Sequence, residues 1–212
     1  MRKCVVAAAL LMVLVGTQAG AQCPPTELIL SEYVEGSSNN KAIEIFNGTS
    51  GAIDLASSDY ELWIYFNGST SPSSQIDLTG SVPADGTFVL CDNDADAGLL
   101  AVCDLEITSS LFNGDDTVVL IKYATKKGAT QTDAVVDSLG QIGFDPGSGW
   151  GAGDVYTANK TLRRKESVCN GDTDTSDVFD PTVEWEGFAQ DTFDGLGSHT
   201  VLPVELMSFS VE

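Results

Sequence analysis

The chain repeats short runs in which apolar and polar residues alternate, a pattern typical of β-strands. In residues 42–46, Ile43 and Ile45 fall on one face and Glu44 on the other, because successive strand residues point to opposite faces. β-Branched and aromatic residues enrich these runs and favour strands. The clear runs span residues 27–34, 42–46, 60–66, 87–90, 116–123, 132–137 and 161–167, with two shorter ones near Ile76 and Thr200.

The segments between the runs carry turn-forming residues. Asn-Gly pairs at 47–48, 67–68 and 113–114 tolerate positive φ and favour tight hairpins. Beyond the N-terminal segment, no stretch of ten or more residues shows a helical apolar stripe, although 95–102 has room for one or two helical turns. Because a parallel α/β sheet needs crossover helices, we predict an all-β, antiparallel β-sandwich.

One segment departs from this pattern. Residues 140–153 hold six glycines, Pro146 and Trp150, which predicts a long irregular loop. Long loops in compact domains often bind ligands, which makes Trp150 a candidate binding residue. The alternative is that Phe144 and Trp150 cap one end of the sandwich.

The N-terminus predicts a signal peptide, residues 1–21. Two basic residues precede an apolar run, 5–15, and the small residues 19–21 lie just before Gln22. This run is shorter than the roughly 20 residues that a spanning helix needs. We therefore expect a secreted protein, extracellular or at the cell surface, with no membrane span.

Acidic residues dominate the charge of the chain. There are 31 acidic and 10 basic residues, and residues 1–21 contain two of the basic ones and none of the acidic ones. The exported chain would carry 31 negative and 8 positive charges, a net charge of −23. This balance excludes a generic cationic nucleic-acid binder. It leaves a protein or a cell-surface ligand as the expected partner.

Four cysteines remain after the signal peptide: Cys23, Cys91, Cys103 and Cys169. In an oxidising compartment an even number predicts two disulfides, with three possible connectivities. The spacing suits a local bond from Cys91 to Cys103, which would leave Cys23 to join Cys169. A zinc site is the alternative, but such sites usually use C-x-x-C pairs, and the chain has none.

Several motifs resemble the bacterial lamin tail domain, in the version found at the N-terminus of large secreted nucleases. Residues 29–47 are similar to its opening and residues 111–120 to its middle, and the later matching motifs are residues 140–147, 150–151, 161–165 and 196–199. The resemblance spans about residues 27–201. It implies an immunoglobulin-like sandwich over residues 22–201, and a non-catalytic accessory module that contacts protein, nucleic acid or a cell surface.

The resemblance brings no catalytic residues. In the nucleases that share this domain, catalysis belongs to a separate downstream domain, so an accessory role in an extracellular nuclease is an alternative function. Residues 202–212 resemble the linker before C-terminal modules of bacterial proteins exported by the type IX route. They predict that the chain is part of a larger exported protein, and the alternative is a final edge strand.

The residues themselves give little support to an enzyme. His199 is the single histidine, and the chain has no G-x-S-x-G motif. Close pairs of carboxylates are inevitable among 31 acidic residues, and we expect Glu32, Glu35 and Glu44 to lie on a solvated face. We therefore predict a non-catalytic protein, and calcium is its one candidate cofactor.

Calcium is the candidate metal. Asp92, Asp94 and Asp96 place carboxylates at alternate positions after a strand, and residues 172–177 repeat this pattern. Calcium prefers such hard oxygen ligands, although neither segment is an EF-hand. If these residues bind calcium, a calcium-stabilised structural domain of the cell surface is an alternative function; the alternative to a calcium site is a solvated, turn-forming loop.

Arg163, Arg164 and Lys165 form the main basic segment and are candidate binding residues. Nucleic acid could bind only through such a local patch. Strand alternation predicts that Arg163 and Lys165 share a face and that Arg164 takes the other. Ion pairs with the abundant Asp and Glu residues are the alternative role.

Overall fold

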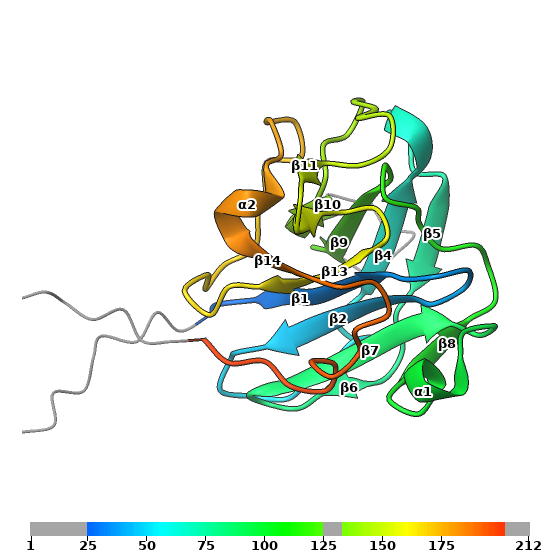
Figure 1. The fold of residues 1–212 in the computed structure, drawn as a ribbon. Coiled ribbons are helices and arrows are strands. Elements are labelled where there is room, and N and C mark those ends of the chain that lie inside the picture. The colour runs from blue at the N-terminus through cyan, green and yellow to red at the C-terminus, as the bar shows by residue number, and fades with distance from the viewer. Residues whose placement is uncertain (1–24, 125–132, 202–212) are drawn as a thin grey trace, which may run out of the picture.

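A computed structural model describes residues 25–124 and 133–201 as two facing sheets (Figure 1). All strand pairs are antiparallel except β7 with β8, which confirms the predicted all-β sandwich. The six-stranded sheet has the order β14 (Trp185–Phe188), β13 (Lys160–Arg164), β1 (Leu28–Glu35), β2 (Lys41–Asn47), β7 (Gly86–Asp92), β8 (Leu105–Ile107). The four-stranded sheet has the order β10 (Asp133–Leu139), β9 (Thr117–Tyr123), β4 (Tyr60–Tyr65), β5 (Ser74–Asp77).

The remaining elements are short. The two-stranded pairs are β3 (Ile53–Asp54) with β6 (Ser81–Val82), and β11 (Gly151–Ala152) with β12 (Val155–Tyr156). The helices are α1 (Ala97–Leu100), α2 (Pro181–Glu184) and a 3-10 turn at Phe66–Gly68. No helix within the described ranges is long and apolar enough to cross a membrane.

The predicted strands agree with the observed ones, with three differences. The short strand near Ile76 is present as β5, whereas residues 198–201 have no regular structure. The strand predicted at 161–167 ends at Arg164. The sequence did not indicate the short strands β3, β6, β8, β11, β12 and β14, because they have two to four residues and too little alternation to stand out.

Apolar side chains from both sheets fill the space between them. Ile43 and Ile45 of β2 lie in this core with Leu62 and Ile64 of β4. The expectation for the opposite face of β2 was wrong, since every residue of β1 and β2 is buried. A second apolar cluster, which includes Leu99 of α1, covers the outer face of these strands. The central strands therefore pack on both faces.

The carboxylates that were expected in solvent are also buried: the second layer covers Glu32 and Glu44, whereas Lys41 and the backbone of Asn159 enclose Glu35. Glu32, Glu35 and Glu44 are 2%, 6% and 1% exposed. Residues 190–200, at the red end of the described chain, pass over the outer face of β1 and β2, and Leu196 packs there against Val34. The cover comes from a segment about 150 residues further along, so local sequence alternation gives no sign of it.

One disulfide is described completely and confirms the predicted local bond. Cys91 at the end of β7 is bonded to Cys103 just after α1, with Cα atoms 6.0 Å apart. The bond fixes α1 beside the sheet edge. Cys169 is also disulfide-bonded, and Cys23, its expected partner, lies outside the described residues.

A buried ion pair joins the two sheets. Asp137 of β10 and Arg164 of β13 have fully buried side chains, and Arg164 Nη2 lies 2.8 and 3.0 Å from the two carboxylate oxygens. Asp137 also accepts hydrogen bonds from the backbone N–H of Leu30 at 2.7 Å and of Asp172 at 2.8 Å. One carboxylate therefore connects β10 with β1, with β13 and with the loop at 172.

A β-bulge brings Asp137 into this position. The register of β10 against β9 shifts between Val135 and Asp137, where one residue is inserted. Val135 packs against a third apolar cluster, formed by Tyr65, Val119 and Ile121 of the four-stranded sheet, whereas Val136 and Leu139 belong to the core between the sheets. The inserted residue breaks strict alternation, so Asp137 faces the opposite sheet together with Val136.

We expect Asp137→Asn to lower the free energy of unfolding by about 3–5 kcal/mol, because it removes the fully buried counter-charge of Arg164 and leaves only the partly exposed Glu184, 3.3 Å from Arg164 Nη1. Urea unfolding under non-reducing conditions measures the change. The matched control is Asp154→Asn, whose side chain is 94% exposed and which should change stability by less than about 0.5 kcal/mol. Equal effects of the two substitutions would contradict the role of the pair.

Candidate binding surfaces

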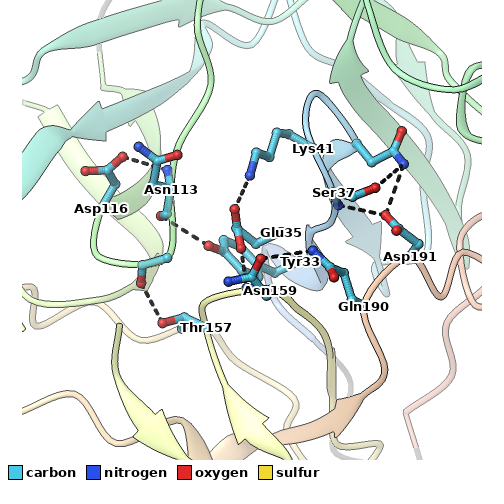
Figure 2. A network of polar contacts seen from close by, with 12 residues as sticks. Tyr33, Glu35, Ser37, Lys41, Asn113, Asp116, Thr157, Asn159, Gln190 and Asp191 are labelled. Atoms are coloured by element: carbon cyan, nitrogen blue, oxygen red, sulfur yellow. Dashed lines mark hydrogen bonds and ion pairs between the residues drawn. The ribbon is translucent and has the colours of Figure 1, made fainter. Parts of the chain in front are cut away.

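The loops at one end of the sandwich are joined by a polar network (Figure 2). Glu35 accepts hydrogen bonds from the Lys41 ammonium across the β1–β2 turn and from the backbone N–H of Asn159. Gln190 Nε2 donates to Asn159 Oδ1 at 3.0 Å. Asp191 Oδ1 accepts from the N–H of Ser37 at 2.8 Å. Three loops that lie far apart in the sequence are thus held together.

The neighbouring loop at 113–116 belongs to the same end. Asp116 accepts from the N–H groups of Asn113 at 2.7 Å and Asn67 at 2.9 Å. Burial raises the pKa of Asp116, although these two hydrogen bonds oppose the rise. Tyr33 Oη donates to the carbonyl of Asn113 at 3.3 Å. Much of the motif at 29–47 and of that at 111–120 therefore fixes the loops and is not presented to a ligand.

The basic segment is paired with acidic and carbonyl groups. Arg163 Nε donates to Glu32 Oε2 at 3.1 Å, and its Nη2 pairs with Asp194. Lys165 Nζ donates to the carbonyls of Thr182 at 2.7 Å and Val183 at 2.9 Å, near the end of α2. As predicted, Arg164 points the other way, into the core.

A pocket of about 730 Å³ lies over this segment. The basic side chains of Arg163 and Lys165 face three acidic side chains in it, and the buried side chain of Arg164 adds no exposed charge, so the pocket offers no surplus of positive charge to a phosphate chain. His199 also lines it, 5.0 Å from the Phe46 ring and edge-on to it. Burial lowers the pKa of His199 to about 4, so the ring is neutral at pH 7. The charged lining residues are Arg163, Arg164, Lys165, Glu166, Glu186 and Asp194.

The structure changes the interpretation of two candidate binding residues. Arg164 has no exposed side-chain surface, because Asp137 and the Trp185 ring enclose it. Trp150 is 5% exposed and packs edge-on against Phe179, with ring centroids 5.8 Å apart. Both residues support the fold from within. Phe144, in the same loop as Trp150, is 50% exposed.

A row of charges crosses the outer face of the six-stranded sheet. The strand register aligns Glu186 of β14, Arg163 of β13, Glu32 of β1 and Glu44 of β2. One arginine thus lies among three carboxylates, two of them buried. Burial raises the pKa of Glu32 to about 7; Arg163 opposes this rise and Glu44 adds to it. Sequence reasoning missed this row, because it depends on the register of four strands, one of which, β14, was not predicted.

The segment after β14 closes over this row. The backbone N–H of Gly197 donates to Glu44 Oε2 at 2.6 Å, and the Ser31 hydroxyl donates to Glu44 Oε1 at 2.7 Å. A Cβ atom at Gly195 would collide with both Glu32 Oε2 and Arg163 Nε, so a larger residue would have to displace this ion pair. The motif at 196–199 thus forms part of a cover over buried acids.

The acidic loop at 92–96 is arranged as a turn. Asp92 Oδ1 accepts from the N–H of Asp94 at 2.9 Å, and Asp96 Oδ2 accepts from Asn40 Nδ2 at 3.0 Å. Among residues 25–124 and 133–201, no three His, Cys, Asp or Glu side chains are grouped so as to hold a metal ion. Calcium binding through Asp92, Asp94 and Asp96 stays a prediction for which the described residues provide no preformed site.

A second hollow, of about 410 Å³, lies between the loop at 171–180 and α2. Val178 and Val183 line it and are 84% and 68% exposed. The other lining side chains are mainly carboxylates. The full set is Gly171, Asp172, Thr173, Asp174, Asp177, Val178, Phe179, Asp180, Val183 and Glu184. The sequence drew attention to the acids here, but gave no sign that the valines remain outside.

The charged row predicts an unusual pH dependence of stability. The folded state raises the pKa of Glu32 from its ordinary 4.5 to about 7, so folding favours the protonated carboxyl. The stability that this group contributes is complete below pH 4.5 and is lost as the pH rises through 7. We expect the free energy of unfolding to lose about 2–3 kcal/mol from this group between pH 5 and pH 8.

Glu32→Gln, which stays neutral, should remove that loss and be more stable than the natural chain at pH 8. Urea unfolding at both pH values measures it. Glu186→Gln is the matched control, because it removes an exposed carboxylate from the same row. If the free energy of unfolding of Glu32→Gln still falls between pH 5 and pH 8 as much as that of the natural chain, the raised pKa of Glu32 is wrong.

Comparison with known proteins agrees with this geometry. The family model described as Lamin Tail Domain matches residues 21–143, more than half of the chain and the region that contains β1 to β10. No curated protein matches the chain. No solved structure matches it either. The antiparallel sandwich and the matched region together show that the chain belongs to the lamin tail domain family.

Proposed function

We propose that this protein is an exported, non-catalytic module that binds or attaches to an extracellular protein or cell surface, as part of a larger exported protein. The observation that carries the proposal is the hollow at 171–184. Two of its apolar side chains are largely exposed on a framework that is otherwise tightly packed. Exposed apolar side chains that gather at one place mark interaction sites more often than isolated ones do.

Several features support export. The basic and apolar N-terminus with its small-residue end is typical of a signal peptide. The disulfide between Cys91 and Cys103, with a bonded Cys169, suits an oxidising compartment. The similarity of several motifs to modules of secreted bacterial nucleases is consistent with such a location.

The disposition of charges favours a protein partner over nucleic acid. Arg163 and Lys165 already have partners, and Arg164 is enclosed in the core. The exported chain has a net charge of −23, which repels a polyanion at long range. The structural character of the family supports a module without catalysis. Glu32 and Glu44, buried acids at facing positions of β1 and β2, are covered by residues 194–197.

Export can be tested in the organism that encodes the chain. We expect the protein in the medium or at the cell surface, with Gln22 at its N-terminus by mass spectrometry. Leu14→Arg interrupts the apolar run and should leave the protein inside the cell with its N-terminal segment attached. Intracellular retention of the natural chain, uncut, would contradict export.

Attachment needs a separate measurement. Purified residues 22–212, labelled with a fluorophore, should bind to cells that lack the gene in a saturable way, and unlabelled chain should displace them. A reduced and alkylated sample is the control, because it loses the disulfides. Binding that rises linearly and resists competition would contradict an attachment module.

A further inference from the structure

We propose that the hollow at 171–184 binds a basic, amphipathic peptide segment of a partner protein, with apolar side chains against Val178 and Val183 and lysine or arginine against the surrounding carboxylates. This inference rests on the proposed binding function and specifies its surface and partner.

The apolar part of the surface is unusual within this protein. In the described ranges, the large apolar side chains that remain exposed are Val102, Phe144, Val178 and Val183, and the last two share one hollow. Val178 is the most exposed of the four. Two neighbouring valines in solvent cost free energy that a partner recovers by covering them.

The valines are exposed although the loop around them is firmly held. The N–H of Asp172 donates to the buried Asp137, and Phe179 packs edge-on against Trp150. Asp180 caps α2 by accepting from the N–H of Thr182 at 2.9 Å. Both ends of the loop are therefore anchored to the core. Such a preformed surface loses little conformational entropy when a partner binds.

The charge around the valines selects the partner. Five carboxylates line the hollow and no basic side chain does; they are Asp172, Asp174, Asp177, Asp180 and Glu184. Burial raises the pKa of Asp172 and of Glu184, and neighbouring carboxylates add to both increases, although the buried Arg164, 3.3 Å from Glu184, opposes them. A lysine or arginine from outside would offset this repulsion. An anionic partner would increase it.

The size of the hollow favours a peptide segment over a flat protein face. A space of about 410 Å³ accepts a few side chains at once. Alternating apolar and basic residues would place one kind toward Val178 and Val183 and the other toward the acidic rim. We therefore expect recognition of an extended or irregular segment that carries both kinds of residue.

A synthetic peptide in which lysine and leucine alternate is the probe. Fluorescence anisotropy with residues 22–212 should give saturable binding that weakens as salt is added, because the rim carboxylates are exposed to screening. A peptide with glutamate in place of lysine should fail to bind. A peptide with serine in place of leucine should bind at least tenfold more weakly.

The double variant Val178→Ser/Val183→Ser locates the site. We expect it to weaken binding of the lysine–leucine peptide about tenfold or more, since two apolar contacts are lost. Val102→Ser is the matched control on the opposite end of the described fold, beside α1, and should leave the affinity unchanged. Asp177→Asn should weaken binding mainly at low salt. Amide shifts in NMR spectra should concentrate in residues 171–184.

Three results would overturn the inference: absence of binding by the lysine–leucine peptide, equal affinity of the double variant and the natural chain, or amide shifts spread over the acidic surface. The cell-attachment assay distinguishes a failure of this inference from a failure of the proposed function. If the double variant still attaches saturably to cells, the module binds elsewhere. If the natural chain does not attach to cells but the peptide binds at residues 171–184, the inferred peptide site is supported and the proposed cell-surface attachment is contradicted.

Discussion

The fold depends on one buried carboxylate that connects strands of both sheets. Asp137 accepts from Arg164, from the backbone of β1 and from the loop that leads to α2. The full charge of Arg164 can be buried because this partner is present, and the Trp185 ring lies 4.7 Å from its guanidinium carbon. Asp137 also provides one of the anchors of the loop whose exposed valines form the proposed binding surface, through the N–H of Asp172. The same interaction therefore contributes to the stability of the fold and to the position of the proposed binding surface.

Local pattern was enough to predict much of the fold. Alternation of Ile43, Glu44 and Ile45 indicated a strand, and it correctly separated Arg164 from Arg163. It did not show what covers the second face of β1 and β2, because Leu196 and Gly197 arrive from far along the chain. The bulge that turns Asp137 inward is equally invisible, since an inserted residue leaves no sign in composition.

The candidate binding surfaces were harder to predict from the sequence than the fold, for a physical reason. The sequence shows which residues are charged, but whether a charge is free depends on partners brought together by folding. Arg163 and Lys165 were singled out as cations, and Glu32 and the end of α2 already occupy them. Val178 stood among acidic turn residues, and its exposure follows from the anchored path of the loop at 171–180.

The central claim is that Arg164 is a structural cation held between the sheets. Residues 22–212 contain two arginines, Arg163 and Arg164, so NMR of their guanidinium groups can separate them after assignment with Arg163→Lys. We predict that the Arg164 guanidinium rotates slowly and exchanges its protons slowly with solvent, since Asp137 holds it out of water. Exchange of both arginines at the rate of free arginine would contradict the account.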